Sequence, residues 1–377
     1  MTSPSSRLVS LDVFRGLAIA SMILVNTPGS WSHVYPPLLH AEWHGFTPTD
    51  LVFPAFLFIA GAAMAFSLHK YHTGTAIDTA LYLRILRRCA LLFTLGLFLN
   101  SFGFIWKNWP SPDFRDLRIL GVLQRISLAY LGGSLLVLNL KWRGLWIATV
   151  GILLLYWLIL MAVPVPGVGI GSLTPEGNVA GYVDRLILGA SHLYTPNFDP
   201  EGLLSTLPSI ATVLLGYFTG NWLRDQPRTS RTSGGLVMFG LGLVIVGALW
   251  GLVFPINKQL WTSSYVLYSG GWSLLLLAAC YELIEVRQIR RWSFPLQVMG
   301  MNAIFVFVAS GIGVRILYYT QIGSGEEAPS TYAWLYETLF VPWAGALNGS
   351  LLFAIANILI WYVVLYGLYR KGWFLKL

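Results

Sequence analysis

Apolar segments of about 20 residues recur along the whole chain, and they restrict what it can fold into more than any other feature. An α-helix of that length crosses a hydrocarbon core about 30 Å thick. The composition agrees, because 56% of the residues are apolar and only 11% are charged, against about 45–50% and about 25% in soluble domains. The pattern predicts an all-α, polytopic membrane protein. It excludes a transmembrane β-barrel, whose strands alternate apolar and polar residues.

We expect a bundle of about ten transmembrane helices that forms a single domain over residues 1–377. The expected spans are residues 8–27, 50–68, 89–106, 119–138, 144–163, 203–223, 234–254, 263–284, 294–317 and 347–369. Because their number is even, both termini lie on the same side of the membrane. We expect no cleavable signal peptide, since the first span carries Asp12 and Arg15 and no small-residue cleavage site follows it.

Basic residues divide unequally between the two sets of segments that connect these spans. Of the 24 lysines and arginines, 16 fall on the side of the termini, five on the opposite side and three within spans. The positive-inside rule therefore predicts cytoplasmic termini. It places three sizeable loops outside, over residues 28–49, 164–202 and 318–346, with a short interfacial helix at 332–343. Since the net charge of +8 follows this topology, nucleic acid is not an expected partner.

Polar groups within the spans suggest function, because they are costly in hydrocarbon. Asp12 and Arg15 lie three residues apart and share one face of a helix. Either they neutralise each other at the cytoplasmic interface, or Arg15 faces a pore and binds an anionic ligand. Gln124 and Arg125 also have a structural and a functional interpretation. Arg125 either bonds to carbonyl groups of another helix or contacts a ligand.

Two helix boundaries flank the first expected outer loop. Asn26 precedes a Pro-Gly pair, so it either caps the first helix or donates its amide to an anionic oxygen, as in an oxyanion hole. Thr47, Pro48 and Asp50 have the order of a helix start, with a threonine N-cap, proline in the first position and a carboxylate near the positive helix end. Asp50 therefore caps a helix, orients a neighbouring imidazole, or does both.

Metal binding is not expected from the cysteines or the histidines. Cys89 and Cys280 both fall inside apolar segments, which argues against a disulfide scaffold and against a thiolate metal site. His33, His40 and His44 lie within twelve residues of one another, but their spacing in a proline-rich loop is not that of a helical zinc pair. A zinc site is therefore the weaker alternative to another functional role for this cluster at the outer mouth of the bundle.

On the residues alone, a transporter and a membrane-embedded transferase fit equally well. The same residues, however, resemble the transmembrane N-acetyltransferase family that includes heparan-α-glucosaminide N-acetyltransferase. The similar segments follow one another in family order over essentially the whole chain: Ser10-Leu11-Asp12-Val13-Phe14-Arg15-Gly16, Leu24-Val25-Asn26, His40-Ala41-x-Trp43-x-Gly45, Asp50-Leu51-Val52-Phe53-Pro54, Gly181–Gly189 with His192-Leu193-Tyr194, Asp199-Pro200-Glu201-Gly202, Gly300-Met301-Asn302-Ala303 and Leu368-Tyr369-Arg370-Lys371.

The resemblance implies transfer of acetyl from cytosolic acetyl-CoA to the amine of glucosamine or a glucosaminide on the far side, without a metal. The family's essential histidine falls on His40 and its functional asparagine on Asn26, with Asp50 as the third catalytic candidate. The remaining candidates are Arg15, Gln124 and Arg125 for the donor and Trp43, Asp184, His192 and Glu201 for the acceptor. The resemblance also implies a homodimer. Because the chain lacks the N-terminal lumenal segment of animal members, we expect a bacterial inner-membrane protein.

The expected chemistry follows from the state of the acceptor. An amino sugar arrives protonated, so a base must remove a proton before nitrogen attacks, and neutral His40 does so near pH 7. Asn26 hydrogen-bonds the thioester oxygen, and Arg15 attracts the donor phosphates. We favour direct transfer over an acetyl-histidine relay. An O-acetyltransferase of a surface glycan and a transporter of an amino sugar or anion stay open, although no internal repeat is visible, and many transporters carry one.

Overall fold

The computed structural model describes residues 8–72, 77–325 and 328–375. Within these residues the secondary structure is helical, apart from two isolated β-bridges between loop residues. The all-α class is therefore confirmed. Arg7 and Lys376, which contribute to the charge count above, lie outside the described residues.

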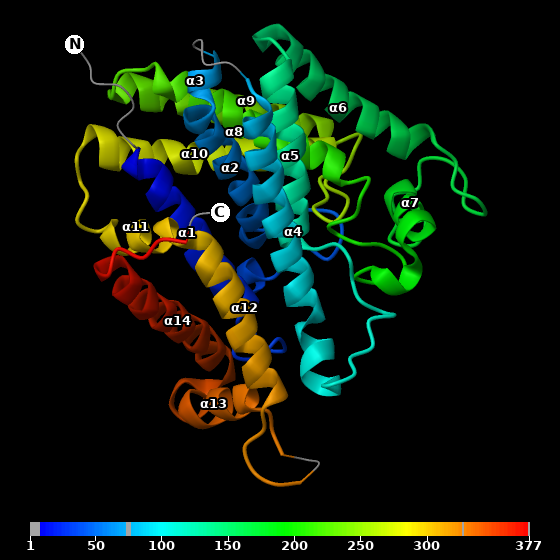
Figure 1. The fold of residues 1–377 in the computed structure, drawn as a ribbon, viewed down its shortest axis with the longest axis vertical. Coiled ribbons are helices and arrows are strands. Elements are labelled where there is room, and N and C mark those ends of the chain that lie inside the picture. Colours follow the sequence, from blue (N-terminus) through cyan, green and yellow to red (C-terminus); the bar gives the residue numbers. More distant parts are fainter. Residues whose placement is uncertain (1–7, 73–76, 326–327, 376–377) are drawn as a thin grey trace.

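Every expected span overlaps at least one helix (Figure 1). The main helices are α1 (Val9–Asn26), α2 (Val52–Ser67), α4 (Thr79–Asn108), α5 (Val122–Asn139), α6 (Trp142–Ala162), α8 (Thr206–Arg224), α9 (Ser230–Trp250), α10 (Ser263–Tyr281), α11 (Phe294–Met301), α12 (Ala303–Tyr319) and α14 (Val341–Arg370). Shorter elements are η1 (Pro36–Leu38), η2 (Pro48–Leu51), α3 (His69–His72), α7 (Val179–Leu188), η3 (Ala190–His192), η4 (Glu282–Val286) and α13 (Thr331–Leu339). The last of these is the short helix expected over 332–343.

The number of membrane-spanning helices differs from the expected ten. Among the described residues, eight helices are long and apolar enough to cross a membrane, or nine if the bent pair α11–α12 forms one span. The expected span 203–223 coincides with α8, which is not among the eight because its threonine, serine and asparagine residues lower its hydropathy. The expected span 294–317 is broken, since α11 and α12 meet at Asn302 with a bend of 82°.

The polar helix α8 lies in the interior of the bundle, where it packs against α2, α5, α6 and α10. Its approach to α2 requires glycine on both helices. A Cβ atom on Gly216 would lie 1.9 Å from the carbonyl oxygen of Phe58, and one on Gly61 would lie 1.8 Å from that of Val213. Small residues allow backbones to pack this closely in membrane helices. Because protein surrounds α8, its hydroxyl groups bond to the helix backbone instead of facing lipid.

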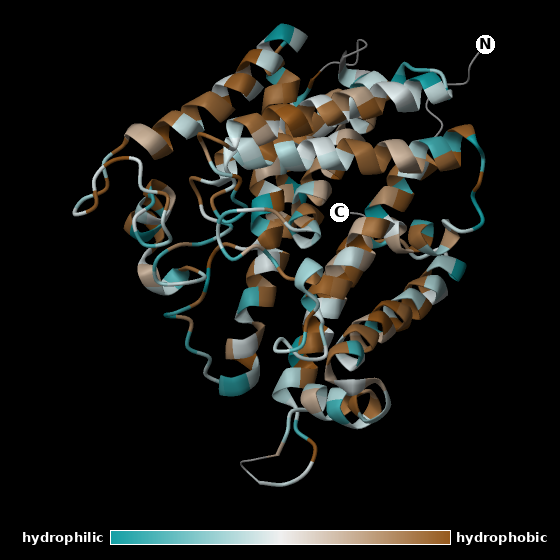
Figure 2. Cartoon of the chain, turned by 180° about the vertical axis from the view of Figure 1, so that it is seen from behind, coloured by the Kyte–Doolittle hydropathy of each residue, from teal (hydrophilic) through white to brown (hydrophobic). Residues whose placement is uncertain are grey.

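The outer helices expose apolar side chains over much of their length. Ile147 on α6, Met238 on α9 and Val363 on α14 are each more than 60% exposed. Figure 2 shows the helices largely brown, with the hydrophilic teal residues concentrated at helix ends and in loops. This distribution suits a surface covered by lipid, because a soluble monomer rarely exposes such large apolar areas.

Several connecting segments meet at one end of the bundle, which we call the loop-rich end. Backbone and side-chain hydrogen bonds join them: Gly45 donates its N–H to the carbonyl oxygen of Ile256 at 2.8 Å, and the indole of Trp43 donates to that of Leu173 at 2.7 Å. The segments of the loop-rich end are residues 27–51, 109–121, 163–205 and 251–262.

The opposite end carries basic residues at helix termini, and we call it the basic end. The 30-residue helix α4 runs from the basic end along the long axis of the molecule (cyan in Figure 1). It therefore offers one continuous surface between the two ends. The residues that define the basic end are Arg84, Arg87, Arg88, Lys141 and Arg143.

Candidate functional site

His40 and Asp50 form a direct pair at the loop-rich end. Asp50 completes a capping box at the start of η2, where its Oδ2 accepts the backbone N–H groups of Thr47 at 3.0 Å and Ala41 at 3.1 Å. The helix start expected at this point is thereby confirmed. The other oxygen, Oδ1, lies 2.6 Å from Nδ1 of His40. The Asp50 side chain is 1% exposed and that of His40 is 40% exposed, so a buried carboxylate fixes a ring that is still accessible.

Lys258 lies against the same histidine. It belongs to the loop between α9 and α10, and its Nζ is 3.0 Å from Nε2 and 3.1 Å from Nδ1 of His40. The distance from Nζ to Oδ1 of Asp50 is 3.9 Å, and the lysine side chain is 15% exposed. Burial lowers the pKa of Lys258, while Asp50 and Glu201 oppose that shift. The structure thus places a carboxylate, an imidazole and an ammonium group together.

A second charged cluster lies at the same end around Arg118, which precedes α5. Its Nε and Nη2 donate to the two oxygens of Asp199 at 2.9 and 2.6 Å, and Nη2 also donates to Glu201. The guanidinium lies 4.8 Å from the centroid of the Tyr194 ring. Burial disfavours the charged form, but the two carboxylates outweigh it and raise the pKa of Arg118. The cluster ties the segment before α5 to the segment before α8.

Asp184 and Arg125 are buried behind this cluster. Asp184 on α7 accepts a hydrogen bond from the N–H of Leu203 at 2.8 Å, and burial raises its pKa to about 6. Arg125 is completely buried, donates to the carbonyl oxygen of Gly202 at 3.2 Å and lies over the ring of Trp261. The bond goes to a backbone carbonyl, as the structural alternative expected, but that carbonyl belongs to the segment before α8 and not to another helix. Because its side chain has no exposed surface, we leave Arg125 out of the donor site.

Four cavities follow α4 from the basic end to the loop-rich end. The first, which we call the arginine cavity, is lined among others by Tyr71, Arg84, Arg87, Arg88 and Tyr130. The next is the central cavity, lined among others by Arg15, Arg88, Leu123 and Tyr130. The third and fourth are the asparagine cavity, with Asn26, Asn100, Arg118, Leu123, Gln124 and Arg315, and the tyrosine cavity, with Asn100, Lys107, Arg118, Tyr194, Arg315 and Tyr319. Neighbouring cavities share Arg88, Leu123 and Arg118 in turn. The row therefore leads through the bundle along one helix.

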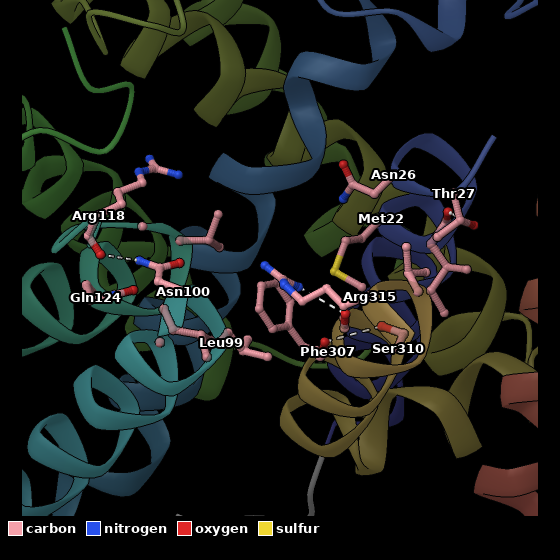
Figure 3. Close-up of a pocket in the computed structure, with 17 residues that line it drawn as sticks. Met22, Asn26, Thr27, Leu99, Asn100, Arg118, Gln124, Phe307, Ser310 and Arg315 are labelled. Atoms are coloured by element: carbon pink, nitrogen blue, oxygen red, sulfur yellow. Dashed lines mark hydrogen bonds between the residues drawn. The ribbon is translucent and has the colours of Figure 1, made fainter. Parts of the chain in front are cut away.

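The asparagine cavity contains the predicted residues Asn26 and Gln124. Figure 3 shows Asn26 from α1, Arg315 from α12 and Arg118 around one common space. Gln124 donates its amide N–H to the carbonyl oxygen of Ile119 at 3.0 Å. Thr27, not Asn26, is the C-cap residue of α1. Asn26 is exposed, so its amide is accessible to a group in the cavity.

Arg15 pairs with Asp12 and also lines a cavity, while binding of an anion by Arg15 stays a prediction. Its Nη1 is 3.1 Å from Oδ1 of Asp12 and 3.4 Å from the carbonyl oxygen of Gly300. The side chain is 26% exposed and lines the central cavity. Arg15 is therefore both the partner of a neighbouring carboxylate and a cation on the wall of the cavity row.

The remaining acceptor candidates help to hold the loops in place. Trp43 packs edge-on against Phe198, with ring centroids 4.9 Å apart. His192 places Nδ1 at 2.8 Å from the carbonyl oxygen of Leu117. Glu201 accepts from Arg118, as described above. These contacts position the segments around the His40–Asp50 pair.

The three histidines of the first loop do not share a partner. His33 is exposed, and Nδ1 of His44 lies 3.2 Å from the side-chain nitrogen of Asn257. Burial lowers the pKa of His44. The structure thus distinguishes His40 from its neighbours by its contacts with Asp50 and Lys258.

Three residues of the site were missed by sequence reasoning. Lys258 is the single basic residue between two long apolar segments, Arg118 stands at the edge of an expected span, and Arg315 is a charge inside one. Each had a signal, because a charge in or beside hydrocarbon needs a partner or a function. None of these patterns indicates which residue is the partner, because the partner of each charge is not apparent from the neighbouring sequence.

Comparison with known proteins now identifies the family. Residues 7–248, more than half of the chain, match the family described as heparan-alpha-glucosaminide N-acetyltransferase, catalytic. The chain belongs to this family. The matched region contains Asn26, His40, Asp50 and Arg118 and ends before Lys258. The resemblance drawn from the sequence motifs is thereby confirmed.

Two curated relatives extend the match beyond the family region. The chain is 31% identical over 362 residues to heparan-alpha-glucosaminide N-acetyltransferase of Mus musculus, and 31% identical over 358 residues to that of Homo sapiens. The alignments cover 81% and 80% of this chain but 53% and 52% of the relatives. The chain thus spans about half the length of the curated relatives it matches.

Proposed function

We propose that this chain is an acetyl-CoA-dependent transmembrane N-acetyltransferase that acetylates the amine of glucosamine or a glucosaminide. The observation that carries the proposal is the pair of His40 and Asp50, with 2.6 Å between Nδ1 and Oδ1. The row of cavities along α4 supports it, because the row joins the arginines of the basic end to Asn26, although His40 lines none of these four cavities. Membership of the heparan-α-glucosaminide N-acetyltransferase family supports acetyl transfer as the reaction.

The arginine cavity at the basic end binds the phosphates of the donor in this proposal. Acetyl-CoA carries phosphates at one end and a thioester at the other, joined by a thin, flexible arm. Arg84, Arg87 and Arg88 line the arginine cavity, where charge-assisted hydrogen bonds to phosphate oxygens form. Arg15 supplies a further cation in the central cavity. The shape of the row fits an arm that reaches the asparagine cavity, past Gln124.

His40 is the general base at the other end. His40 first passes one proton of the acceptor's ammonium group to water. Asp50 holds the Nδ1–H, so Nε2 then takes a second proton from the neutral amine nitrogen as that nitrogen attacks the thioester carbon. The carbon–sulfur bond then breaks, the electron pair leaves on sulfur, and the imidazolium returns the proton to the thiolate. Asn26 donates its amide hydrogen to the thioester oxygen while negative charge develops. The products are an acetamido sugar and free coenzyme A.

The acceptor enters between the loops of the loop-rich end. Trp43 is half-buried and Glu201 has 11% of its side chain exposed, so an aromatic face and a carboxylate meet the sugar and its ammonium group. His192 and Asp184 act behind them, because their bonds to the segments before α5 and α8 position Glu201. These assignments belong to the proposal.

The orientation follows from the charges, with the basic end in the cytoplasm and the loop-rich end in the periplasm of a bacterial inner membrane. Ser32 is exposed in the first loop, and Ser32→Cys should react with a membrane-impermeant maleimide added to spheroplasts. Labelling that occurs only in inverted vesicles would contradict the orientation. We also propose a homodimer, which a mass measurement in detergent checks.

Release of coenzyme A thiol by the purified protein tests the function. With acetyl-CoA, glucosamine should stimulate release, and mass spectrometry should detect N-acetylglucosamine. Equal stimulation by glucose, which has hydroxyl groups and no amine, would instead support O-acetylation. Transport of labelled glucosamine into proteoliposomes without any thiol release would support a transporter.

A further inference from the structure

Lys258 has no role in the mechanism above, although it touches the residue at its centre. Its Nζ is almost equally distant from both nitrogens of the His40 ring, at 3.0 and 3.1 Å. A hydrogen bond to one lone pair would bring it close to one nitrogen only. The ammonium group therefore lies against the ring as a whole, where its charge acts on either nitrogen.

The loop that carries Lys258 is held by several hydrogen bonds. Asn257 accepts the N–H of Leu260 at 2.8 Å with its side chain, and its own N–H donates to the hydroxyl of Thr262 at 3.0 Å. Trp261 adopts a φ of 53°, which is uncommon for a large residue, and its indole N–H donates to Thr212 on α8 at 3.2 Å. Because both sides of the loop are fixed, Lys258 is held at its position beside His40.

The charges that surround Lys258 come from four elements. Asp50 of η2 and Glu201 before α8 attract the ammonium group, and Arg125 of α5 repels it. The hydroxyl of Tyr265 on α10 donates to the backbone carbonyl of Asp50 at 2.7 Å. His44 of the first loop is kept apart by its contact with Asn257. The two carboxylates therefore oppose the effects of burial and of Arg125 on the ammonium group.

We propose that Lys258 is a positioning residue for His40, which holds the imidazole against Asp50 and limits its protonation. The proposal rests on the role of His40 as the base. Asp50 alone would favour an imidazolium, because a carboxylate at hydrogen-bond distance stabilises the charged ring. A second cation about 3 Å away opposes that charge. The carboxylate and the ammonium group therefore act on the charge of the ring in opposite directions.

The same repulsion assists the second half of the transfer. Once His40 has taken the proton from the amine, the imidazolium and the Lys258 ammonium are two cations in contact. Return of the proton to the departing thiolate removes that repulsion and restores the neutral ring. Lys258 itself neither gains nor loses a proton in this sequence.

Chemical modification of His40 tests the proposal without relying on catalysis. Diethylpyrocarbonate reacts with neutral imidazole, and peptide mass spectrometry measures modification at His40 from pH 5 to 9. In Lys258→Met, the midpoint of the modification curve should move up by about one pH unit. Lys258→Arg keeps the charge and should keep the midpoint of the unmodified sequence. Lys258→Gln removes the charge but retains a donor, and it replaces the methionine variant if that variant does not fold.

The rate of acetyl transfer gives the second readout. In Lys258→Met, transfer should fall about tenfold at pH 6, with the loss shrinking as the pH rises, while acetyl-CoA binding is unchanged. Lys141→Met, a lysine at the basic end outside the cavities, should change neither profile. A midpoint and a pH–rate profile in Lys258→Met that parallel those of the starting protein would overturn the proposal. Absence of transfer in the starting protein would instead refute the proposed function, and the modification curves would still decide the role of Lys258.

Discussion

Charge is handled in opposite ways at the two ends of the cavity row. At the loop-rich end, Arg118 contacts Asp199 and Lys258 contacts Asp50. These pairs are largely buried. A buried charge that is paired in this way keeps a fixed geometry, because separating it from its partner would leave an unpaired charge in the interior and cost free energy.

At the basic end, the arginines of the arginine cavity face tyrosines. Nη1 of Arg84 is 3.5 Å from the hydroxyl of Tyr71, and the guanidinium of Arg88 lies 4.6 Å from the centroid of the Tyr130 ring. An arginine that rests on an aromatic ring keeps its positive charge available to an anion. In the proposed function, this difference suits a loop-rich end that orients reacting groups and a basic end that attracts a polyanion.

Replacing His40 should have the largest effect, and it should affect the loop-rich end alone. His40→Ala should lose about 10²–10⁴-fold in transfer rate, because only the loop-rich end loses its base. Binding of acetyl-CoA, measured by calorimetry, should be unchanged, and part of the rate should return at high pH, where more of the amino sugar is unprotonated. His33→Ala is the control and should be mild. Near-normal turnover of His40→Ala at pH 7 would exclude both the base and the relay, and a trapped acetylated His40 would favour the relay.

The carboxylate behind the histidine should have the next largest effect. Asp50→Asn should reduce transfer by about 10²-fold, because an amide no longer favours the Nδ1–H tautomer or stabilises the imidazolium. Asp78 is a matched control, since it also sits at a helix start and accepts the N–H of Leu81 at 2.9 Å. Asp78→Asn should leave transfer intact. Equal losses in the two variants would mean that Asp50 serves only the helix.

A substitution at the basic end should affect binding and not chemistry. Arg88→Gln should raise the Kd for acetyl-CoA about tenfold at low salt, because a charge-assisted contact contributes roughly 1.5–3 kcal/mol. The effect should shrink at high salt, and kcat at saturating donor should stay unchanged. Arg143→Gln, outside the cavities at the same end, is the control. A fall in kcat with unchanged Kd would contradict the division between the two ends.

The smallest predicted effect concerns stability. The pKa of Asp184 is raised to about 6 in the folded protein, from the ordinary 3.8. Between about pH 4 and pH 6 the Asp184 carboxyl group is therefore ionised in the unfolded chain but still largely protonated in the folded one. The folded state therefore loses stability as the pH rises through this range. Asp184→Asn removes that loss and should raise Tm above pH 6, with no difference below about pH 4.

An exposed carboxylate should behave in the opposite sense. Asp113 pairs with Arg115, which lowers the pKa of Asp113, so Asp113→Asn should gain nothing above pH 6. Thermal denaturation in detergent over pH 4–8 checks both variants. A Tm difference between Asp184→Asn and the starting protein that does not change with pH would contradict the raised pKa of Asp184.

The helices were predictable because their signal is local. Apolar runs located each span, and the order of Thr47, Pro48 and Asp50 located the start of α2. The break at Asn302 was not predictable, because the apolar pattern continues through it. Asn302 instead bonds to the backbone of Trp373 and Leu375 at 3.0 and 2.9 Å, a contact that only the folded chain creates.

The site was predictable only in part, for the same reason. His40 and Asp50 are ten residues apart, and a capped helix start next to a histidine already suggested their contact. Lys258 is 218 residues from His40, and the Arg118 contacts with Asp199 and Glu201 span more than 80 residues. No short-range pattern encodes such pairs, because they arise when separate loops converge.

If the proposed function holds, the length of α4 sets a minimum size for the acyl carrier. Arg88 and Asn100 are twelve residues apart on this helix, which corresponds to about 18 Å at 1.5 Å per residue. A short thioester such as S-acetylcysteamine cannot occupy the arginine cavity and the asparagine cavity at once, whereas a long carrier with phosphates at its far end can. The bundle would therefore select its carrier by length as well as by charge, because the spacing of the two cavities along α4 sets the shortest carrier that occupies both.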